Sequence, residues 1–66
     1  MSMVLSDIGK LIRSERKKHN LTIKQLADKL DVTMRAIIYW ERGAKLPSLA
    51  TVDKLLELFN LKLTIE

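Results

Sequence analysis

Residues 21–43, which read LTIKQLADKLDVTMRAIIYWERG, constrain the fold more than any other part of the chain. They predict two short helices joined by a tight turn. Thr22 and Gln25 have the spacing of a capping box, in which a Thr hydroxyl accepts from the Gln amide and the Gln side chain reaches back. Asp31 suits the turn because Asp tolerates the left-handed backbone conformation better than most residues. Thr33 is placed to cap the second helix.

The second of these helices, which should end at Gly43, has two different faces. At about 100° per residue, Ile37 and Trp40 lie on one apolar arc. The opposite arc combines cations, an aromatic ring and apolar tips, and it would expose Met34, Arg35, Ile38, Tyr39 and Arg42. An ordinary surface helix is the alternative, but its exposed face would consist mostly of Glu, Lys and Gln. In a small basic protein, such a helix is predicted to enter the major groove of DNA.

Four residues on this face are predicted to read bases: Met34, Arg35, Ile38 and Tyr39. An arginine can donate two hydrogen bonds to guanine, and apolar tips can touch thymine methyl groups. Two alternatives stay open, because Arg35 could clamp a phosphate instead and Ile38 could pack against the preceding helix. A second set of residues is placed to contact phosphates and to set the register on DNA: Thr22, Lys24, Thr33, Arg42 and Lys45.

The 66 residues suffice for one domain, 1–66, with a small core. The net charge of +4 is uneven, with +5 over residues 1–45 and −1 over residues 46–66, which suits a polyanion on one side and self-association on the other. The chain has no cysteine and one histidine, so a thiolate metal site is excluded and no cofactor is predicted. It lacks a membrane-spanning run and a signal-peptide pattern, so a cytoplasmic location is expected. The sequence shows no paired carboxylates, no nucleophile–base pair and no glycine-rich phosphate loop, so an enzyme is not predicted.

Two further helices are predicted outside this region. The first should begin near Ser6 as its N-cap and end at Asn20, which can adopt a left-handed cap conformation. The last should follow Ser48 as its N-cap. Its spacing predicts a buried stripe of Leu49, Val52, Leu56 and Phe59, with Leu55 and Leu58 in excess of what a small core needs.

The core should also receive side chains from the two central helices, among them Leu26, Ala27, Leu30 and Ile37. Trp40 shares the arc of Ile37 and is predicted to be a core residue. Glu41 lies next to that arc and is expected to pair with Arg13 or Arg16. A basic stripe on the first helix, Lys10, Arg13 and Lys17, is either a solvated face or a phosphate contact, and His19 is expected to be a solvated helix end.

After the last helix the hydrophobic period changes to two: Leu61, Leu63 and Ile65 alternate with Lys62, Thr64 and Glu66. A lone strand in a helical chain exposes unpaired edges. The simplest solution is pairing with the same strand of a second copy in a two-fold dimer, and the alternative is a frayed tail. The predicted dimer interface comprises Leu58, Leu61, Leu63, Thr64 and Ile65.

These residues resemble a known family over about residues 8–61. The matching positions are Leu21-Thr22, Gln25-Leu26-Ala27, Lys29-Leu30, Val32-Thr33, Ile37, Trp40-Glu41-Arg42-Gly43 and Pro47-Ser48-Leu49. They resemble the Cro/CI, or XRE, helix-turn-helix family with its lambda-repressor-like fold. The resemblance implies an all-α, four-helix domain that binds specific double-stranded DNA, mostly as a homodimer and without catalysis.

The tail LKLTIE in place of a fifth helix resembles the HipB antitoxins. That resemblance implies strand pairing in a dimer, repression of the protein's own operon and a HipA-type kinase toxin as a partner. The predicted function is therefore a DNA-binding repressor with an antitoxin role. It is expected to bind a palindromic operator as a dimer, with its two reading helices about 34 Å apart. The alternatives are a stand-alone XRE regulator and a module that mainly binds a toxin.

Several residues depart from the family pattern and limit what the resemblance implies: Ile23, Asp31, Met34, Ala36 and Ile38. The family usually has Gln where this chain has Ile23, and Gly where Asp31 stands. That Gln commonly contacts the DNA backbone, which Ile23 cannot do by hydrogen bonding. The reading face also differs from the usual Ser, Thr and Arg, so base preferences are not carried over from the family.

Overall fold

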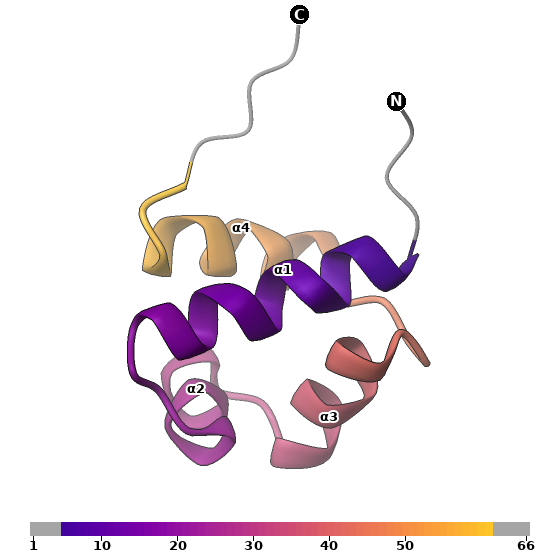
Figure 1. The fold of residues 1–66 in the computed structure, drawn as a ribbon, viewed down its shortest axis with the longest axis horizontal. Helices are drawn as coiled ribbons and strands as arrows, with labels where there is room; N and C mark the ends of the chain where they lie inside the picture. Colours follow the sequence, from indigo (N-terminus) through magenta and orange to yellow (C-terminus); the bar gives the residue numbers. More distant parts are fainter. Residues whose placement is uncertain (1–4, 62–66) are drawn as a thin grey trace, which may run out of the picture.

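A computed structural model describes residues 5–61, with side chains from Asp7 onward, as an all-helical domain (Figure 1). The part described contains four helices and no strand: α1 Leu5–Lys18, α2 Ile23–Leu30, α3 Met34–Arg42 and α4 Leu49–Leu58. In Figure 1, α1 crosses above α2 and α3, and α4 runs behind α1. The closest backbone packing joins α1 to α3 and α2 to α3, and α4 packs chiefly on α2.

The capping chemistry of α2 is confirmed. The backbone amide of Gln25 donates to Thr22 Oγ1 at 3.0 Å, and the Thr22 amide donates to Gln25 Oε1 at 2.9 Å. Asp31 ends α2 in the left-handed conformation, with φ 56°. The amide of Val32 donates to the Ala27 carbonyl at 3.0 Å, so the chain turns sharply toward α3.

The caps of α3 and α4 are confirmed as well. Thr33 Oγ1 accepts from the Ala36 amide at 3.1 Å, and Gly43 ends α3 with φ 75°. Ser48 Oγ accepts from the Thr51 amide at 3.2 Å at the start of α4. These short-range bonds explain why the boundaries of both helices could be found from local residue types.

The first helix differs from the prediction at its start. It begins at Leu5, so Ser6 lies inside α1 and is not its N-cap. The first amides of a helix have no intrahelical partner, so its starting residue is weakly fixed by hydrogen bonds. The predicted end is confirmed, because Asn20 is left-handed with φ 58°.

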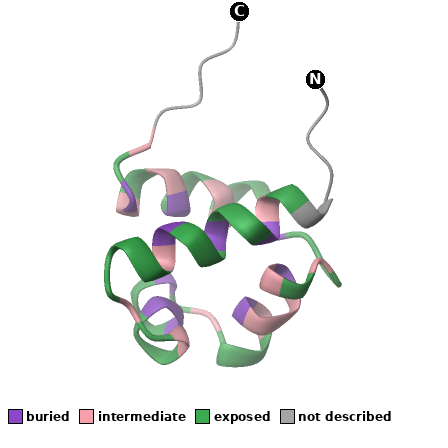
Figure 2. Ribbon diagram, in the orientation of Figure 1, coloured by how far each residue is buried: buried purple, intermediate pink, exposed green. Residues whose placement is uncertain are grey.

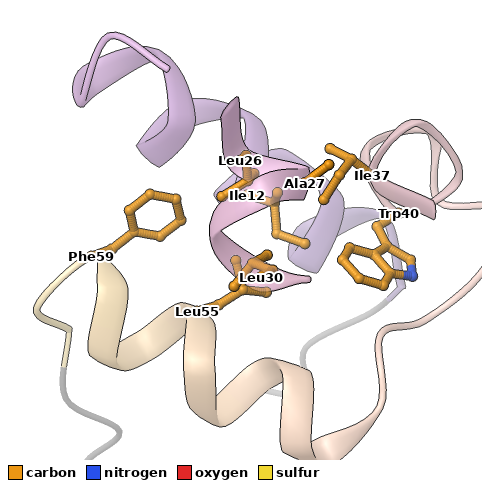
Figure 3. Packing of buried hydrophobic residues seen from close by; sticks show 8 residues of the cluster. All are labelled: Ile12, Leu26, Ala27, Leu30, Ile37, Trp40, Leu55 and Phe59. Atoms are coloured by element: carbon orange, nitrogen blue, oxygen red, sulfur yellow. The ribbon is translucent and has the colours of Figure 1, made fainter. Parts of the chain in front are cut away.

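Apolar side chains from all four helices and from the residue after α4 converge in one core (Figure 3), and Figure 2 marks the buried positions along the ribbon in purple. The buried apolar residues are Ile12, Leu26, Ala27, Leu30, Ile37, Trp40, Leu55 and Phe59. Leu26 and Ile37 are fully buried at the centre, where α2 meets α3. Trp40 is 8 % exposed, which confirms its predicted place in the core.

The predicted buried stripe of α4 is wrong in part. Leu55 is buried at 6 % exposure, whereas Leu49 is 89 % exposed. Val52 and Leu56 are half-buried, and Phe59 is buried as predicted. At about 100° per residue, Leu49 lies roughly 120° around α4 from Leu55. The helix is therefore rotated so that Leu55 faces α2, an orientation that α4's own period cannot specify.

Leu55→Ala is expected to lower the free energy of unfolding by about 2–5 kcal/mol, because it removes a buried side chain and leaves a cavity. Leu46→Ala is the matched control, since Leu46 is 57 % exposed and should change stability by less than about 0.5 kcal/mol. Urea denaturation followed by circular dichroism measures both. Equal effects of the two variants would contradict this orientation of α4.

The predicted dimer strand falls mostly outside the described residues, since Leu63, Thr64 and Ile65 belong to 62–66. Leu61 is described and is not in a strand. Its amide donates to the Leu56 carbonyl at 2.8 Å, a hydrogen bond that closes the end of α4. Leu58 and Leu61 are half-buried and pack against the domain's own core, so part of the predicted interface is already used within the monomer.

Candidate nucleic-acid interface

The outward face of α3 carries the residues that the sequence singled out. Met34 is 46 % exposed, and Arg35 and Arg42 are exposed. Tyr39 is half-buried beside them. Ile37 and Trp40 hold the opposite face of the helix in the core. The predicted division of α3 is therefore confirmed for Met34, Arg35 and Arg42, whereas Ile38 and Tyr39 are half-buried at its edge.

A hollow of about 350 Å³ lies between α1, α2 and α3. Its lining combines three arginines, a glutamate and two isoleucines: Arg13, Arg16, Ile23, Ile38, Glu41 and Arg42. Ile38 is half-buried and shares this lining with Ile23 of α2. This placement favours the alternative in which Ile38 packs toward α2. The arginines make the hollow rich in fixed positive charge.

An ion pair between Arg16 and Glu41 joins α1 to α3 at the hollow. Arg16 Nε lies 2.7 Å from Glu41 Oε2, and Nη2 donates to Oε1 at 3.1 Å. The remaining nitrogen, Nη1, donates to the Leu21 carbonyl at 3.0 Å. Both side chains are largely covered, with 12 % and 9 % exposure. Of the two partners expected for Glu41, Arg16 is the one found.

The hydrogen bond from Arg16 to Glu41 raises the pKa of Arg16, and burial opposes this by a smaller amount. The guanidinium is thus charged at any ordinary pH, and the two parallel hydrogen bonds fix its orientation. One end of α1 and the end of α3 are consequently held in a set geometry, which in turn orients the outward face of α3.

The aromatic ring of Tyr39 has a cation above it. Lys45 Nζ lies 5.2 Å from the centroid of the Tyr39 ring, within the range of a cation–π interaction. Lys45 is exposed in the segment after Gly43. The contact holds a positive charge close to Tyr39 on the outward face of α3.

Two threonines and one lysine at the starts of α2 and α3 complete the predicted set of phosphate contacts. Thr22 and Thr33 use their hydroxyl oxygens as acceptors for helix amides, so each O–H remains able to donate. Lys24 is exposed in the first turn of α2. Helix starts attract anions through their free amides and the helix dipole.

Comparison with known proteins decides the family, because residues 12–65 match the helix-turn-helix family model. The chain belongs to the XRE-type helix-turn-helix family. In helix-turn-helix domains, the second helix of the motif enters the major groove and the first crosses the backbone. These correspond to α3 and α2 here. The resemblance to the XRE family seen in the sequence is thereby confirmed.

Two archaeal relatives carry a similar helix-turn-helix segment. A "Putative HTH-type transcriptional regulatory protein" of Methanothermobacter thermautotrophicus is 35 % identical over 57 residues, covering 86 % of this chain and 18 % of the relative. A protein of Thermococcus kodakarensis with the same designation is 35 % identical over 52 residues, covering 79 % of this chain and 16 % of the relative. The chain thus spans less than a fifth of the length of the relatives it matches.

The structure of this helix-turn-helix domain also reveals three residues that the sequence analysis left out or misjudged. A Cβ on Gly9 of α1 would overlap the Trp40 carbonyl oxygen and lie 2.9 Å from the Glu41 carbonyl oxygen.

Glu15 is buried at 8 % exposure. His19 Nε2 lies 3.7 Å from its carboxylate, and the His19 ring lies 5.0 Å from the Phe59 ring. His19 is exposed as expected but it is packed. The i, i+4 spacing of Glu15 and His19 could have indicated their contact.

Neither a metal-binding cluster nor a membrane-spanning helix is found in the described part of this helix-turn-helix domain. Residues 5–61 contain no cluster of His, Cys, Asp or Glu that could hold a metal ion. None of the described helices is long and apolar enough to cross a membrane.

Proposed function

We propose that this chain is a sequence-specific DNA-binding transcriptional repressor that inserts α3 into the major groove. The observation that carries the proposal is the outward face of α3, where Arg35 and Met34 are exposed while the opposite face is buried. The names of the two relatives support a regulatory role. The +5 charge of residues 1–45 supports attraction to DNA.

Arg35 is the main base-reading residue in this proposal. Its planar guanidinium can donate two hydrogen bonds to O6 and N7 of one guanine, and it has no acidic partner among the ion pairs within the described residues. Met34 and Tyr39 can contact thymine methyl groups, since such contacts need an apolar surface and not a hydrogen bond. Ile38, which is half-buried, can add an apolar contact at the edge of this face nearest to α2.

Contacts to the phosphates hold α3 in register. The proposed donors are Thr22, Lys24, Thr33, Arg42 and Lys45. The hollow adds Arg13, which lines it together with Arg42. These contacts contribute affinity and salt dependence without reading sequence. Because Arg13 shares the lining of this hollow with Arg42, we favour a phosphate contact for Arg13 over a merely solvated position.

The repressor is proposed to act as a homodimer on a palindromic operator. A two-fold dimer presents two α3 helices about one DNA turn, roughly 34 Å, apart. The described Cα atoms extend over 34 × 24 × 21 Å, so two copies side by side have centres a comparable distance apart. A core this small also benefits from the apolar area that a second copy would bury.

Arg35→Ala is expected to weaken binding to the cognate operator by about 5–150-fold, because a bidentate arginine–guanine contact contributes about 1–3 kcal/mol of discrimination. Fluorescence anisotropy with DNA from upstream of the gene, against scrambled DNA and over a salt series, measures the change. Arg35→Lys is the matched control for charge. It should lose most of the discrimination, because lysine lacks the planar fork.

Arg42→Ala separates the two kinds of contact. It should weaken binding to both DNAs alike and reduce the salt slope by about one, as expected for a phosphate contact. Equal, steeply salt-dependent binding of the unaltered protein to upstream and scrambled DNA would overturn the proposal of sequence-specific repression.

The antitoxin role is a second candidate that rests on the pattern of residues 61–66. In that role the protein also binds a kinase toxin of the HipA type, on a surface separate from α3. Arg35→Ala should then lose the operator and keep the toxin complex. A neighbouring gene for a kinase-like protein, whose product co-purifies with this chain, supports this role over a stand-alone regulator. A purified candidate toxin that does not bind argues against it.

A further inference from the structure

The hollow between α1, α2 and α3 has two kinds of wall. Arg13, Arg16 and Arg42 line it with guanidinium groups, whereas Ile23 and Ile38 line it with apolar side chains. Both isoleucines are half-buried, so each leaves some apolar surface exposed. Small-molecule sites combine apolar walls with a few charged or polar groups, and their volumes begin at about 300 Å³. The hollow, at about 350 Å³, has both properties.

Positive charge is in excess in this hollow, because its lining includes three arginines and one carboxylate, that of Glu41. Arg16 already holds Glu41 through two hydrogen bonds, so it is a fixed part of the wall. Arg13 and Arg42 are exposed and take part in no ion pair within the described residues. These two arginines are therefore available to bind an anion through charge-assisted hydrogen bonds.

The two isoleucines distinguish the hollow from a plain phosphate site. A phosphate of the DNA backbone is bound through charge and hydrogen bonds, and neither requires an apolar wall. An anion with an apolar body uses both walls. Its head contacts the guanidinium groups, while its body covers Ile23 and Ile38 and removes their exposed surface from water. The lining therefore matches an amphipathic anion better than a phosphate group alone.

The walls of this site are held in place before a ligand arrives. The ion pair of Arg16 and Glu41, with a shortest N–O distance of 2.7 Å, joins α1 to α3. Arg16 also donates to the Leu21 carbonyl at 3.0 Å, just before Ile23 begins α2. All three helices are thus linked around the hollow. A pre-formed site reduces the entropy that a ligand must lose to order its surroundings.

We propose that the hollow binds a small organic anion, with a carboxylate or phosphate head on Arg13 and Arg42 and an apolar body on Ile23 and Ile38. The same two arginines are proposed to contact the DNA backbone. The bound anion therefore competes with DNA for them and releases the operator. This inference rests on the proposed DNA-binding function and adds a small-molecule regulator to it.

Phenyl phosphate is the first probe, because it combines an anionic head with an apolar ring. Inorganic phosphate is the control without an apolar body, and phenol is the control without a charge. NMR titration of the full chain should shift the amide signals of Ile23, Ile38 and Arg13 until they saturate. The dissociation constant should be at least about tenfold lower than for either control, because only the probe uses both walls.

Phenylacetate, titrated in the same way, distinguishes the two head groups. It carries a carboxylate in place of the phosphate, and its apolar ring is the same. The tighter of the two probes identifies the head that the hollow prefers. If neither probe binds at least tenfold more tightly than inorganic phosphate, or if the shifted signals lie away from the hollow, the site is overturned.

Two substitutions test the two walls separately. Ile23→Gln makes the apolar wall polar and should raise the dissociation constant of phenyl phosphate to about that of inorganic phosphate. Leu46→Gln is its matched control, since Leu46 is 57 % exposed and does not line the hollow. Arg13→Met should weaken both phosphates about tenfold or more, because it removes a charged hydrogen-bond donor.

Circular dichroism verifies that each variant is folded. Ile23 packs against the core, whereas Arg13 is exposed, so Arg13→Met keeps the test valid if Ile23→Gln does not fold. Unchanged binding of phenyl phosphate to folded Arg13→Met or folded Ile23→Gln would contradict the assigned walls.

Competition with DNA tests the regulatory part of the proposal. At constant ionic strength, phenyl phosphate should release upstream DNA at concentrations near its own dissociation constant, as measured by fluorescence anisotropy. Inorganic phosphate at the same concentrations should release far less DNA, because it lacks the contacts to the isoleucines. DNA that stays bound while the hollow is saturated with phenyl phosphate would overturn the competition.

Failure of this inference can be told apart from failure of the proposed function. If the chain binds phenyl phosphate in the hollow but binds upstream and scrambled DNA alike, the repressor proposal fails and the anion site stands. If the chain binds upstream DNA specifically but shows no preference for amphipathic anions, the anion site fails and the repressor proposal stands.

Discussion

Gly9→Ala is expected to lower the free energy of unfolding by about 3 kcal/mol or more, a large share of the 5–15 kcal/mol typical of small domains. The added Cβ would overlap the Trp40 carbonyl oxygen and crowd that of Glu41. Both obstacles are backbone atoms, which cannot rotate away, so α1 must move off α3. Urea denaturation at 25 °C measures the loss.

The sign of this result is decisive because helix propensity predicts the opposite. Alanine is more favourable than glycine in a helix interior by roughly 1 kcal/mol. Lys10→Ala serves as the control, since Lys10 is the exposed neighbour of Gly9 and should alter stability by less than about 0.5 kcal/mol. A Gly9→Ala protein as stable as the original would mean that α1 does not approach α3 this closely.

Arg16→Met is expected to cost about 2–3 kcal/mol of stability, between the values for exposed and fully buried ion pairs. The change leaves the Glu41 carboxylate largely covered and without its main partner, and it also removes the hydrogen bond to the Leu21 carbonyl. Adding Glu41→Leu should restore part of the loss, because the unpaired charge is removed. Thermal and urea denaturation of the single and double variants give the coupling.

Arg13→Met is the matched control for this cycle. Arg13 lines the same hollow but is exposed, so its replacement should change stability by less than about 0.5 kcal/mol.

The raised pKa of Arg16 means that its stabilising contribution is present below the ordinary arginine pKa and is lost only as pH rises through the higher folded value. Strictly additive effects of Arg16→Met and Glu41→Leu would show that the pair contributes nothing as a unit.

Local signals in the sequence predicted the helix junctions well. Thr22, Asp31, Thr33 and Gly43 act through backbone groups no more than a few residues away, so their types are nearly sufficient evidence. The two-faced character of α3 was predictable for a similar reason, because its period places Ile37 and Trp40 on one side. The pairing of Glu41 with an arginine of α1 followed from its position next to that side.

Features that depend on how helices meet could not be obtained from the same signals. The helical period of α4 places leucines on more than one side of the helix, so it does not determine which side is buried. Contact with α2 buries Leu55 and leaves Leu49 exposed. Gly9 gave no local sign of its role, since its lack of a side chain matters only because α3 passes so near. The roles of Arg35 and the other proposed DNA contacts depend on a partner outside the chain, so they are proposals for experiment.

The turns after α1, α2 and α4 each contain a residue other than glycine in the left-handed backbone conformation: Asn20, Asp31 and Asn60. A side chain in that conformation costs on the order of 1 kcal/mol in the folded state, although glycine would lose more freedom on folding. The two effects oppose each other at each corner. The melting temperature of this protein can therefore be changed by substituting glycine at these three positions alone, while the core and the outward face of α3 keep their present residues.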